Sequence, residues 1–162
     1  MKKEVRDKNS FTVGIISDTH GLLRPEAVYA LQGADLIIHA GDIGKQSIMD
    51  ELNNIAPIVA VRGNMDNENW AYKLKRTEIV EKNKILFCVI HDIGRLDLDP
   101  AAADINVVIS GHSHRPAAGR HKGVLYINPG SAGPQRSTLP VSVALLQVKG
   151  NVLDAKIVKL KV

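Results

Sequence analysis

The stretch "FTVGIISDTHG", Phe11 to Gly21, begins as an apolar, β-rich run and ends in polar residues. A run of this kind predicts a buried strand. Asp18 and His20 follow it directly, one residue apart. A surface loop would accept this pair without any function, whereas a metal site would need a carboxylate and an imidazole close together. Other motifs in the chain are needed to decide between a plain loop and a metal site.

Four further apolar runs follow the first. They are "DLIIHA" (35–40), "PIVAVR" (57–62), "KILFCVI" (84–90) and "INVVIS" (105–110). Between the first three runs lie two segments with helical spacing, "RPEAVYALQG" (24–33) and "KQSIMDELNNIAP" (45–57). Pro25 suits the start of the first helix, and Pro57 blocks continuation of the second. The alternation of strand and helix predicts parallel β-α-β units and an α/β fold.

The last part of the chain has a different pattern. The runs "GVLYINP" (123–129), "PVSVALLQV" (140–148) and "NVLDAKIVKL" (151–160) predict strands joined by short turns, and "KGN" (149–151) predicts a hairpin. We therefore expect a single domain over residues 1–162, with residues 1–10 as a flexible N-terminal tail. Its helices should lie outside two sheets.

Each of the first five runs ends in polar residues of similar chemistry. These are Asp18 and His20, then Asp42, then Asn64 and Asp66, then His91 and Asp92, then His112 and His114. Because sites in parallel sheets form at the carboxyl ends of strands, we expect these side chains at one edge. Their imidazole, carboxylate and amide groups suit manganese, iron, nickel or zinc. A single Asp-x-His or Gly-Asn is often a plain loop, but five such motifs in order favour a metal site.

Glycines directly precede three of these residues. Gly41, Gly63 and Gly111 come before Asp42, Asn64 and His112. A glycine lets the backbone turn sharply and approach other groups closely, because it has no Cβ. Of the other polar residues, His39 fits a structural or supporting role better than a ligand role. Asn128, in "NPGS", is either a plain turn residue or a support for the metal-binding loops.

The order of these motifs resembles the calcineurin-like metallophosphoesterase superfamily, in particular its small single-domain YfcE-like phosphodiesterase branch. The motifs, from about Phe11 to Ser131, are "SDTHG", "HAGDI", "RGNMD", "VIHD", "SGHSHRP" and "YINPGS". The resemblance implies a four-layer α/β sandwich, with two mixed sheets packed face to face and helices on both outer sides. It also implies two divalent metal ions. One would be held by Asp18, His20, Asp42 and His114, and the other by Asp42, Asn64, His91 and His112.

The charge of such a site indicates a mechanism. Two divalent cations bring four positive charges, of which Asp18 and Asp42 offset two. The remaining positive field favours a phosphate anion and a metal-bound hydroxide, which would act as the nucleophile. We therefore expect a metal-dependent phosphodiesterase with Asp42, Asn64 and His112 as catalytic residues. Manganese is the expected cofactor, and nickel, iron and zinc are the alternatives.

Two positions depart from the family pattern. Many relatives have a histidine directly after the Gly-Asn pair, thought to protonate the leaving group, whereas this chain has Met65. The general acid is therefore unassigned, with Asp66 as one candidate. Relatives usually have glycine after the ligating histidine, and this chain has Asp92 there. Its carboxylate could either orient His91 or point to solvent.

The distribution of charge and the low aromatic content argue against nucleic acid as a partner. The net charge is +4, but residues 1–8 carry +2 and residues 149–162 carry +3, which leaves −1 for the middle of the chain. With only 4% aromatic residues, this distribution predicts no dedicated nucleic-acid patch. The single cysteine, Cys88, excludes an internal disulfide, and no apolar stretch has the length of a signal peptide or a membrane span. We expect a cytoplasmic protein with a small phosphodiester or other phosphate-ester substrate, no membrane partner, and an open possibility of homo-oligomers.

A different class of function shares this fold. The retromer subunit of the eukaryotic trafficking machinery resembles these enzymes but serves as a non-catalytic protein-interaction scaffold, with an incomplete ligand set. All seven candidate ligand positions are intact in this chain. The intact set favours an enzyme over a scaffold.

Overall fold

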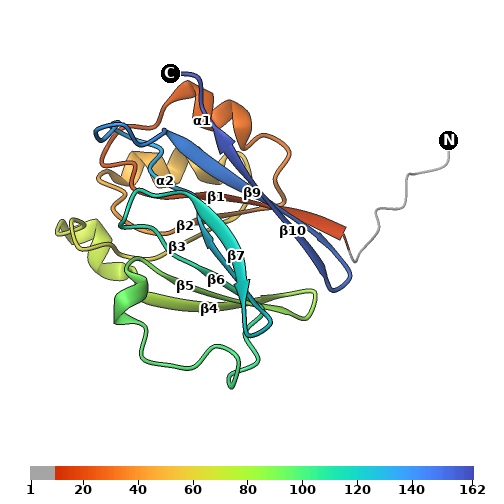
Figure 1. Ribbon diagram of the computed structural model, residues 1–162. Helices are drawn as coiled ribbons and strands as arrows, with labels where there is room; N and C mark the ends of the chain where they lie inside the picture. The colour runs from red at the N-terminus through yellow and green to blue at the C-terminus, as the bar shows by residue number, and fades with distance from the viewer. Residues whose placement is uncertain (1–9) are drawn as a thin grey trace, which may run out of the picture.

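The computed structural model describes residues 10–162 and places their strands in two five-stranded mixed sheets packed face to face (Figure 1). The first sheet has the order β10 (Val152–Lys159), β9 (Ser142–Lys149), β1 (Ser10–Ile16), β2 (Leu36–His39) and β3 (Ile58–Ala60). The second has the order β4 (Thr77–Lys82), β5 (Ile85–Ile90), β6 (Val107–Ile109), β8 (Val124–Asn128) and β7 (Ala117–His121). Within them, β1, β2 and β3 run parallel, as do β5, β6 and β8. The predicted pair of facing mixed sheets is confirmed.

The main core lies between the two sheets. On β1, Phe11, Val13 and Ile15 face the second sheet, because successive strand residues point to opposite faces. Other strands supply the buried residues Leu36, Ile38, Phe87, Val89, Val107, Ile109, Leu125, Ile127, Leu146 and Val148. Apolar burial on this scale fixes the register of the strands, and with it the positions where each strand ends.

Two helices cover the outer face of the first sheet, at the top of Figure 1. They are α1 (Pro25–Ala30) and α2 (Gln46–Asn53), within the two segments in which helices were predicted. Ile48 and Leu52 of α2 pack in a second buried cluster with Ile16 and Ile37 of the sheet. The helices therefore use an amphipathic pattern to bury the outward side of the parallel strands.

The outer face of the second sheet has a different cover from the one expected. Within residues 10–162, both α-helices pack on the first sheet, and the chain after β5 forms only the short 3₁₀ helix η2 (Ile93–Arg95). Leu96 and Leu98, from the chain that follows η2, pack on Cys88 and Val108. A helix does not form here because the segment "IGRLDLDP" is rich in turn-forming residues and ends in proline. Burial raises the pKa of the Cys88 thiol, as expected for an unreactive structural cysteine.

Four elements escaped prediction: the edge strands β4 and β7, the 3₁₀ helix η1 (Asn69–Lys73) and the 3₁₀ helix η2. The β7 residues are all exposed, and β4 has mixed polar and apolar side chains, none of them fully buried. Edge strands need bury little surface, so their sequences resemble loops. The predicted β9–β10 hairpin is confirmed. Of the predicted N-terminal tail, residues 1–9 lie outside the described residues, and Ser10 is the first residue of β1.

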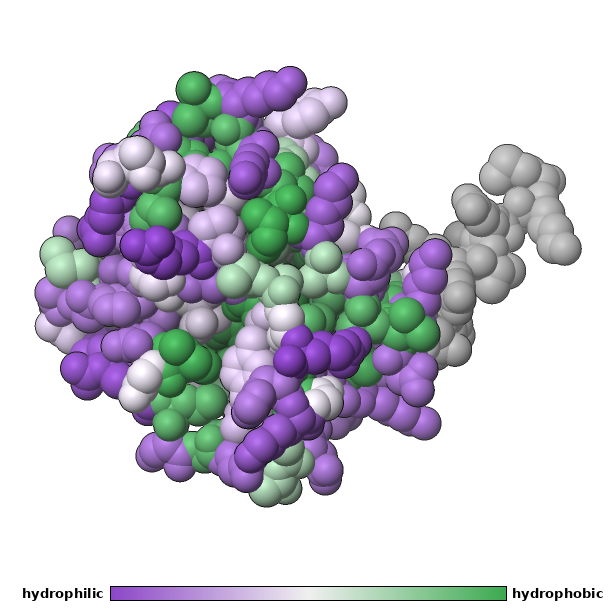
Figure 2. Space-filling view, viewed as in Figure 1, coloured by the Kyte–Doolittle hydropathy of each residue, from purple (hydrophilic) through white to green (hydrophobic). Residues whose placement is uncertain are grey.

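The surface gives no indication of a membrane-spanning segment. In residues 10–162, no helix has the length and apolar character needed to cross a bilayer. On the face shown in Figure 2, hydrophobic residues occur in small groups separated by hydrophilic ones. Scattered apolar residues of this kind are normal for a protein surface.

The core predicts a large effect for one substitution. Phe87 has no exposed surface and lies between the two sheets. We expect Phe87→Ala to lower the free energy of unfolding by about 3–5 kcal/mol, because it removes buried surface and leaves a cavity. Tyr29→Ala is the control: its ring is 83% exposed, so the change should stay below about 0.5 kcal/mol. Urea unfolding of both variants measures this, and equal effects would contradict the assigned core.

Candidate metal centre

The candidate ligands lie on loops that leave the carboxyl ends of the parallel strands. The loop after β1 carries Asp18 and His20, and the loop after β2 carries Asp42. The second sheet contributes His91 directly after β5, and His114 after β6. These five residues, which are far apart in the sequence, meet in one cluster at the edge shared by the two sheets. The predicted convergence of strand ends is confirmed for them.

One oxygen of Asp18 faces three imidazole rings. Its Oδ1 lies 3.3 Å from Nε2 of His114, 3.6 Å from Nε2 of His20 and 3.8 Å from Nε2 of His91. The Asp18 side chain has no exposed surface. A buried carboxylate surrounded by imidazole nitrogens is a donor set that first-row divalent metals favour.

Asp42 lies on the other side of the same cluster. Its Oδ2 is 3.2 Å from Nε2 of His91 and 3.8 Å from Nε2 of His20. The cluster thus contains two groups with ligand spacing: Asp18 with His20 and His114, and Asp18 with Asp42 and His91. The residue common to both groups is Asp18, whereas the family resemblance implied Asp42 as the bridge between two metals. The bridging role of Asp42 stays a prediction.

The cluster holds most of the unsatisfied polar atoms of the described chain. Within residues 10–162, the buried side-chain nitrogens and oxygens without a hydrogen-bond partner are Asp18 Oδ1, His20 Nε2, His91 Nε2, His114 Nδ1 and Arg62 Nε. Leaving such atoms unpaired typically costs about 1–3 kcal/mol each. Four of the five belong to residues of the cluster, and a cation between the carboxylates and the imidazoles would satisfy Asp18 Oδ1, His20 Nε2 and His91 Nε2. The residues present therefore fit a metal site.

The ring of His91 is oriented for ligation. Its Nδ1 donates a hydrogen bond of 2.7 Å to the carbonyl of Ala40. The other nitrogen, Nε2, is therefore the one that faces the carboxylates. A backbone carbonyl on the far side of the ring is the usual way in which a metal-binding histidine is held in position.

Charge complementarity holds the carboxylates ionised. Burial on its own raises the pKa of Asp18, but the nearby His20 imidazole and the hydrogen bond from Ser17 outweigh it and lower this pKa below its ordinary value. The contact with Asp18 in turn raises the pKa of His20. Burial lowers the pKa of His91, but the Asp42 carboxylate 3.2 Å away and the other nearby negative charge raise it above the ordinary value. The cluster is thus an electronegative site that draws positive charge.

The backbone of the cluster is strained. Five candidate ligands have positive φ, a region that residues other than glycine rarely adopt. They are Asp18 (57°), His20 (47°), Asp42 (56°), His112 (70°) and His114 (64°). Strain of this kind costs about 1–3 kcal/mol per residue and persists only where the surrounding structure enforces it, which is common at functional sites.

The glycines before the ligands are required by close packing. A Cβ on Gly63 would overlap the carboxylate of Asp42, and one on Gly111 would overlap the hydroxyl of Ser17. A Cβ on Gly41 would lie 2.8 Å from Nδ1 of His91. The prediction that these glycines permit close approach is confirmed.

His39 links two of the metal-site loops. Its Nδ1 accepts a hydrogen bond from the N–H of Gly41, so its Nε2 carries the proton and donates to the hydroxyl of Thr19. Thr19 in turn donates to the carbonyl of Ile43. Burial lowers the pKa of His39 to about 3, so the ring is neutral. It lies outside both groups with ligand spacing and supports the loops, as the sequence suggested.

Asp66 also anchors loops. One of its oxygens accepts hydrogen bonds from the backbone N–H groups of Ile43 and Gly44, and the other accepts one from Gly63. The side chain is buried, so these contacts are shielded from water. Both carboxylate oxygens are thus occupied as acceptors of backbone hydrogen bonds. This position favours a structural role over proton donation.

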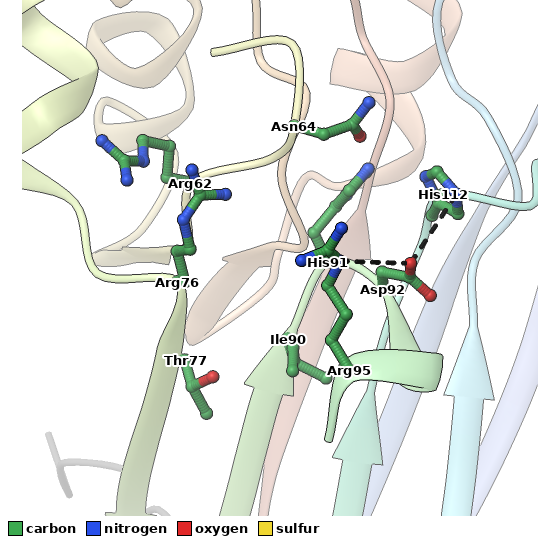
Figure 3. Close-up of a pocket in the computed structure, with 9 residues that line it drawn as sticks. All are labelled: Arg62, Asn64, Arg76, Thr77, Ile90, His91, Asp92, Arg95 and His112. Carbon is green, nitrogen blue, oxygen red and sulfur yellow. Dashed lines mark ion pairs between the residues drawn. The ribbon is translucent and has the colours of Figure 1, made fainter. Parts of the chain in front are cut away.

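Asn64 and His112 lie on the open side of the cluster. Both are exposed, and with His91 they line a cavity of about 580 Å³ (Figure 3). The rings of His91 and His112 meet edge to face, with centroids 5.2 Å apart. Asn64 and His112 are thus beside the cluster but outside the two groups with ligand spacing.

Asp92 does not orient His91. Its Oδ1 accepts a hydrogen bond from Gly94, and its Oδ2 lies 3.8 Å from Nε of Arg95 and 3.9 Å from Nε2 of His112. The alternatives drawn from sequence were contact with His91 or exposure to solvent. The structure instead directs this half-buried carboxylate toward a different histidine and an arginine.

Sequence reasoning missed several supporting residues. The hydroxyl of Ser17 donates to Asp18 Oδ2, and that of Ser131 donates to the Asp18 carbonyl. Serines are common in loops, so nothing in the sequence distinguished these two. Asn128, for which a supporting role was considered, donates to the Gly111 carbonyl and the Ser113 hydroxyl.

Comparisons with known proteins agree with this geometry. Residues 11–151 match the calcineurin-like phosphoesterase superfamily domain. A probable metallophosphoesterase of Methanocaldococcus jannaschii is 38% identical, over 92% of this chain and 81% of the relative. The phosphodiesterase YfcE of Escherichia coli is 27% identical, over 80% of this chain and 84% of the relative.

Solved structures also share the fold. Vacuolar Protein Sorting 29 from Cryptosporidium parvum aligns with a TM-score of 0.75 over 94% of this chain and 99% of its own, at 17% identity. An identity this low shows a common fold and no more. The family match and the curated relatives confirm the resemblance drawn from the motifs, and the chain belongs to the calcineurin-like phosphoesterase superfamily, on the side of its YfcE-like members.

Proposed function

We propose that this protein is a dinuclear-metal phosphodiesterase. The observation that carries the proposal is the buried cluster in which Asp18 Oδ1 faces three imidazoles while four side-chain atoms lack a hydrogen-bond partner. A purely structural cluster would have paired these atoms, because unsatisfied buried polar groups are costly. The names of curated relatives, among them phosphodiesterase YfcE, support the same reaction.

In this proposal, seven residues hold two divalent metal ions. One ion takes Asp18, His20, Asp42 and His114, and the other takes Asp42, Asn64, His91 and His112. Bound metals of this kind stabilise the charge of a phosphoryl group and lower the pKa of water so that it can attack. The mixed nitrogen and oxygen donors favour manganese, with nickel, iron and zinc as alternatives.

The protein's own residues prepare and orient the reaction. The buried Asp18 and Asp42 provide negative charge, and the Ala40 carbonyl keeps the His91 ring in place. Asn64 and His112, on the open wall, would meet the phosphoryl group that enters the cavity. The buried Cys88 lies on the outer face of the second sheet, so water is the nucleophile in this proposal.

A scaffold function is the alternative. The match to Vacuolar Protein Sorting 29 is a match of fold and does not decide between the two classes. The retained donor set argues for the enzyme, since a scaffold has no need to keep strained, unpaired ligands in its interior. Metal content and hydrolysis separate the two functions.

The first test measures metal binding. Protein prepared with manganese should carry about two ions per chain after desalting, measured by elemental analysis. Asp42→Asn should reduce both sites, because Asp42 holds both ions in this proposal and its Oδ2 lies beside His20 and His91. His20→Ala should mainly reduce one site. Asp154→Asn is the matched control and should keep both ions, because Asp154 is an exposed carboxylate on the edge strand β10. An Asp42→Asn protein with two tightly held metals would exclude Asp42 as the bridge.

The second test measures activity. We expect the protein to hydrolyse bis(4-nitrophenyl) phosphate, to lose this activity on exhaustive dialysis against a chelator, and to regain it with manganese or nickel. Magnesium should restore little, because it prefers all-oxygen ligation. Full activity in the metal-free protein would contradict the proposed function. A protein with bound metals but no hydrolysis of any phosphodiester would favour the scaffold.

The third test concerns the general acid. Met65 has an exposed side chain with no proton to donate, and its N–H bonds to Asp42. We expect the rate of the chemical step to fall steeply as the leaving-group pKa rises from 4-nitrophenol to phenol to an alkyl alcohol. Met65→His should speed the poorest leaving groups by about 10²-fold, within the range of a positioned acid. Met65→Leu should keep the steep slope, whereas a flat slope in the unaltered protein would mean that an acid acts elsewhere.

A further inference from the structure

The cavity beside the cluster holds more positive charge than a simple diester needs. Asn64, His91 and His112 line it on the side of the metal centre. The remaining lining residues are Arg62, Arg76, Thr77, Ile90, Asp92 and Arg95. The lining therefore contains three arginines and one carboxylate, so it is more positively charged than the middle part of the chain, whose net charge is near zero. Figure 3 shows Arg62 and Arg76 on one side of this cavity and His112 on the other.

Arg62 and Arg76 come from neighbouring segments. The N–H of Arg62 donates a hydrogen bond of 2.9 Å to the carbonyl of Lys75, the residue before Arg76. The Arg62 guanidinium lies over the ring of Tyr72, 4.9 Å from its centre. This stacking orients the guanidinium, since arginine binds aromatic faces through its planar charge. The pair is thus a defined feature of the cavity wall.

These two arginines have no counter-charge. Arg95 is paired with Asp92, at 3.8 Å, but neither Arg62 nor Arg76 has an ion-pair partner among residues 10–162. Nε of Arg62 is buried and makes no hydrogen bond within the described part of the chain. A buried guanidinium nitrogen without an acceptor is costly, and an anion in the cavity would supply the acceptor.

The cavity is large enough to hold this anion in addition to the reacting phosphoryl group. A volume of about 580 Å³ falls in the range of sites for whole small molecules, well above the needs of one phosphate. In the proposed function the scissile phosphate sits at the metal centre, near His91 and His112. Arg62 and Arg76 are then left to bind a different group of the same substrate.

We propose that Arg62 and Arg76 bind a second phosphate group of the substrate. The substrate class is then a small phosphodiester in which one alcohol component carries a further phosphate. Guanidinium groups match phosphate oxygens with two parallel hydrogen bonds each, which gives both affinity and orientation. The identity of the reaction rests on the proposed function, but the phosphate site itself can be tested without catalysis.

The direct test uses inorganic phosphate and metal-free protein at low ionic strength. Phosphate should bind to the unaltered protein, and Arg62→Gln and Arg76→Gln should each weaken this binding about tenfold or more, the usual effect of losing a charge-assisted hydrogen bond. Arg120→Gln is the matched control, because Arg120 is an exposed arginine on β7, at the opposite edge of the sheet from β4. Arg76 is also exposed, so Arg76→Gln tests the site even if Arg62→Gln does not fold. Equal affinity in all four proteins, measured by calorimetry, would overturn the proposal.

The kinetic test compares two substrates with the same leaving group. Thymidine 5′-(4-nitrophenyl phosphate) is offered with and without a 3′-phosphate to the metal-loaded protein. The 3′-phosphate should raise kcat/KM about tenfold in the unaltered protein and in Arg120→Gln, and this ratio should fall toward one in Arg62→Gln and Arg76→Gln. A ratio of one in the unaltered protein would contradict the proposed substrate class. If neither ester is hydrolysed but phosphate binding depends on both arginines, the phosphate site stands and the phosphodiesterase function fails.

Discussion

The carboxylate of Asp18 is the point on which the structure of the site depends. It is fully buried at the junction of the two sheets and contacts loops from both of them. Oδ2 accepts hydrogen bonds from the Ser17 hydroxyl and the N–H of His112, while Oδ1 faces the imidazoles without a hydrogen bond. Its main chain bonds to Gly41 and Ser131. A buried charge is tolerated only with close polar partners, so the loops of both sheets must close around it.

The site has a rigid, buried half and an open half. In the buried half, His39 and Asp66 hold the loops together by hydrogen bonds, and both side chains are shielded from water. Asn64 and His112 belong to the open half, which faces the cavity. This division suits a hydrolase, because precise ligand geometry needs a rigid frame while substrate must enter from solvent. In the proposed function, the side chains of the cavity wall determine which substrates bind.

The fold alone leaves the function open. The same fold occurs in an archaeal phosphodiesterase and in Vacuolar Protein Sorting 29. What distinguishes an enzyme is the state of the site, since unrelated functions can share a fold. Here the donor atoms are retained, five ligand positions are held in a strained backbone, and arginines line the adjoining cavity. These features distinguish an enzyme from a scaffold, whereas the topology only brings them together.

The sequence by itself determined the main strands, both helices and the candidate ligands. Periodicity and chemistry at the ends of strands are local properties, and Asp18, Asp42 and His91 stood directly after apolar runs. The edge strands β4 and β7 escaped because they bury too little to show a pattern.

Only the tertiary structure decided which polar residues support the ligands. Ser131 looks like an ordinary loop residue in the sequence, and Asp66 looks like a candidate acid, until the chain brings them to Asp18 and to the backbone of Gly44. Arg62 and Arg76 likewise lie 14 positions apart in the sequence, and a backbone hydrogen bond from Arg62 to Lys75 joins their segments. The reason is physical: hydrogen bonding and charge act over a few ångströms in space, and separation along the chain does not predict which groups come that close.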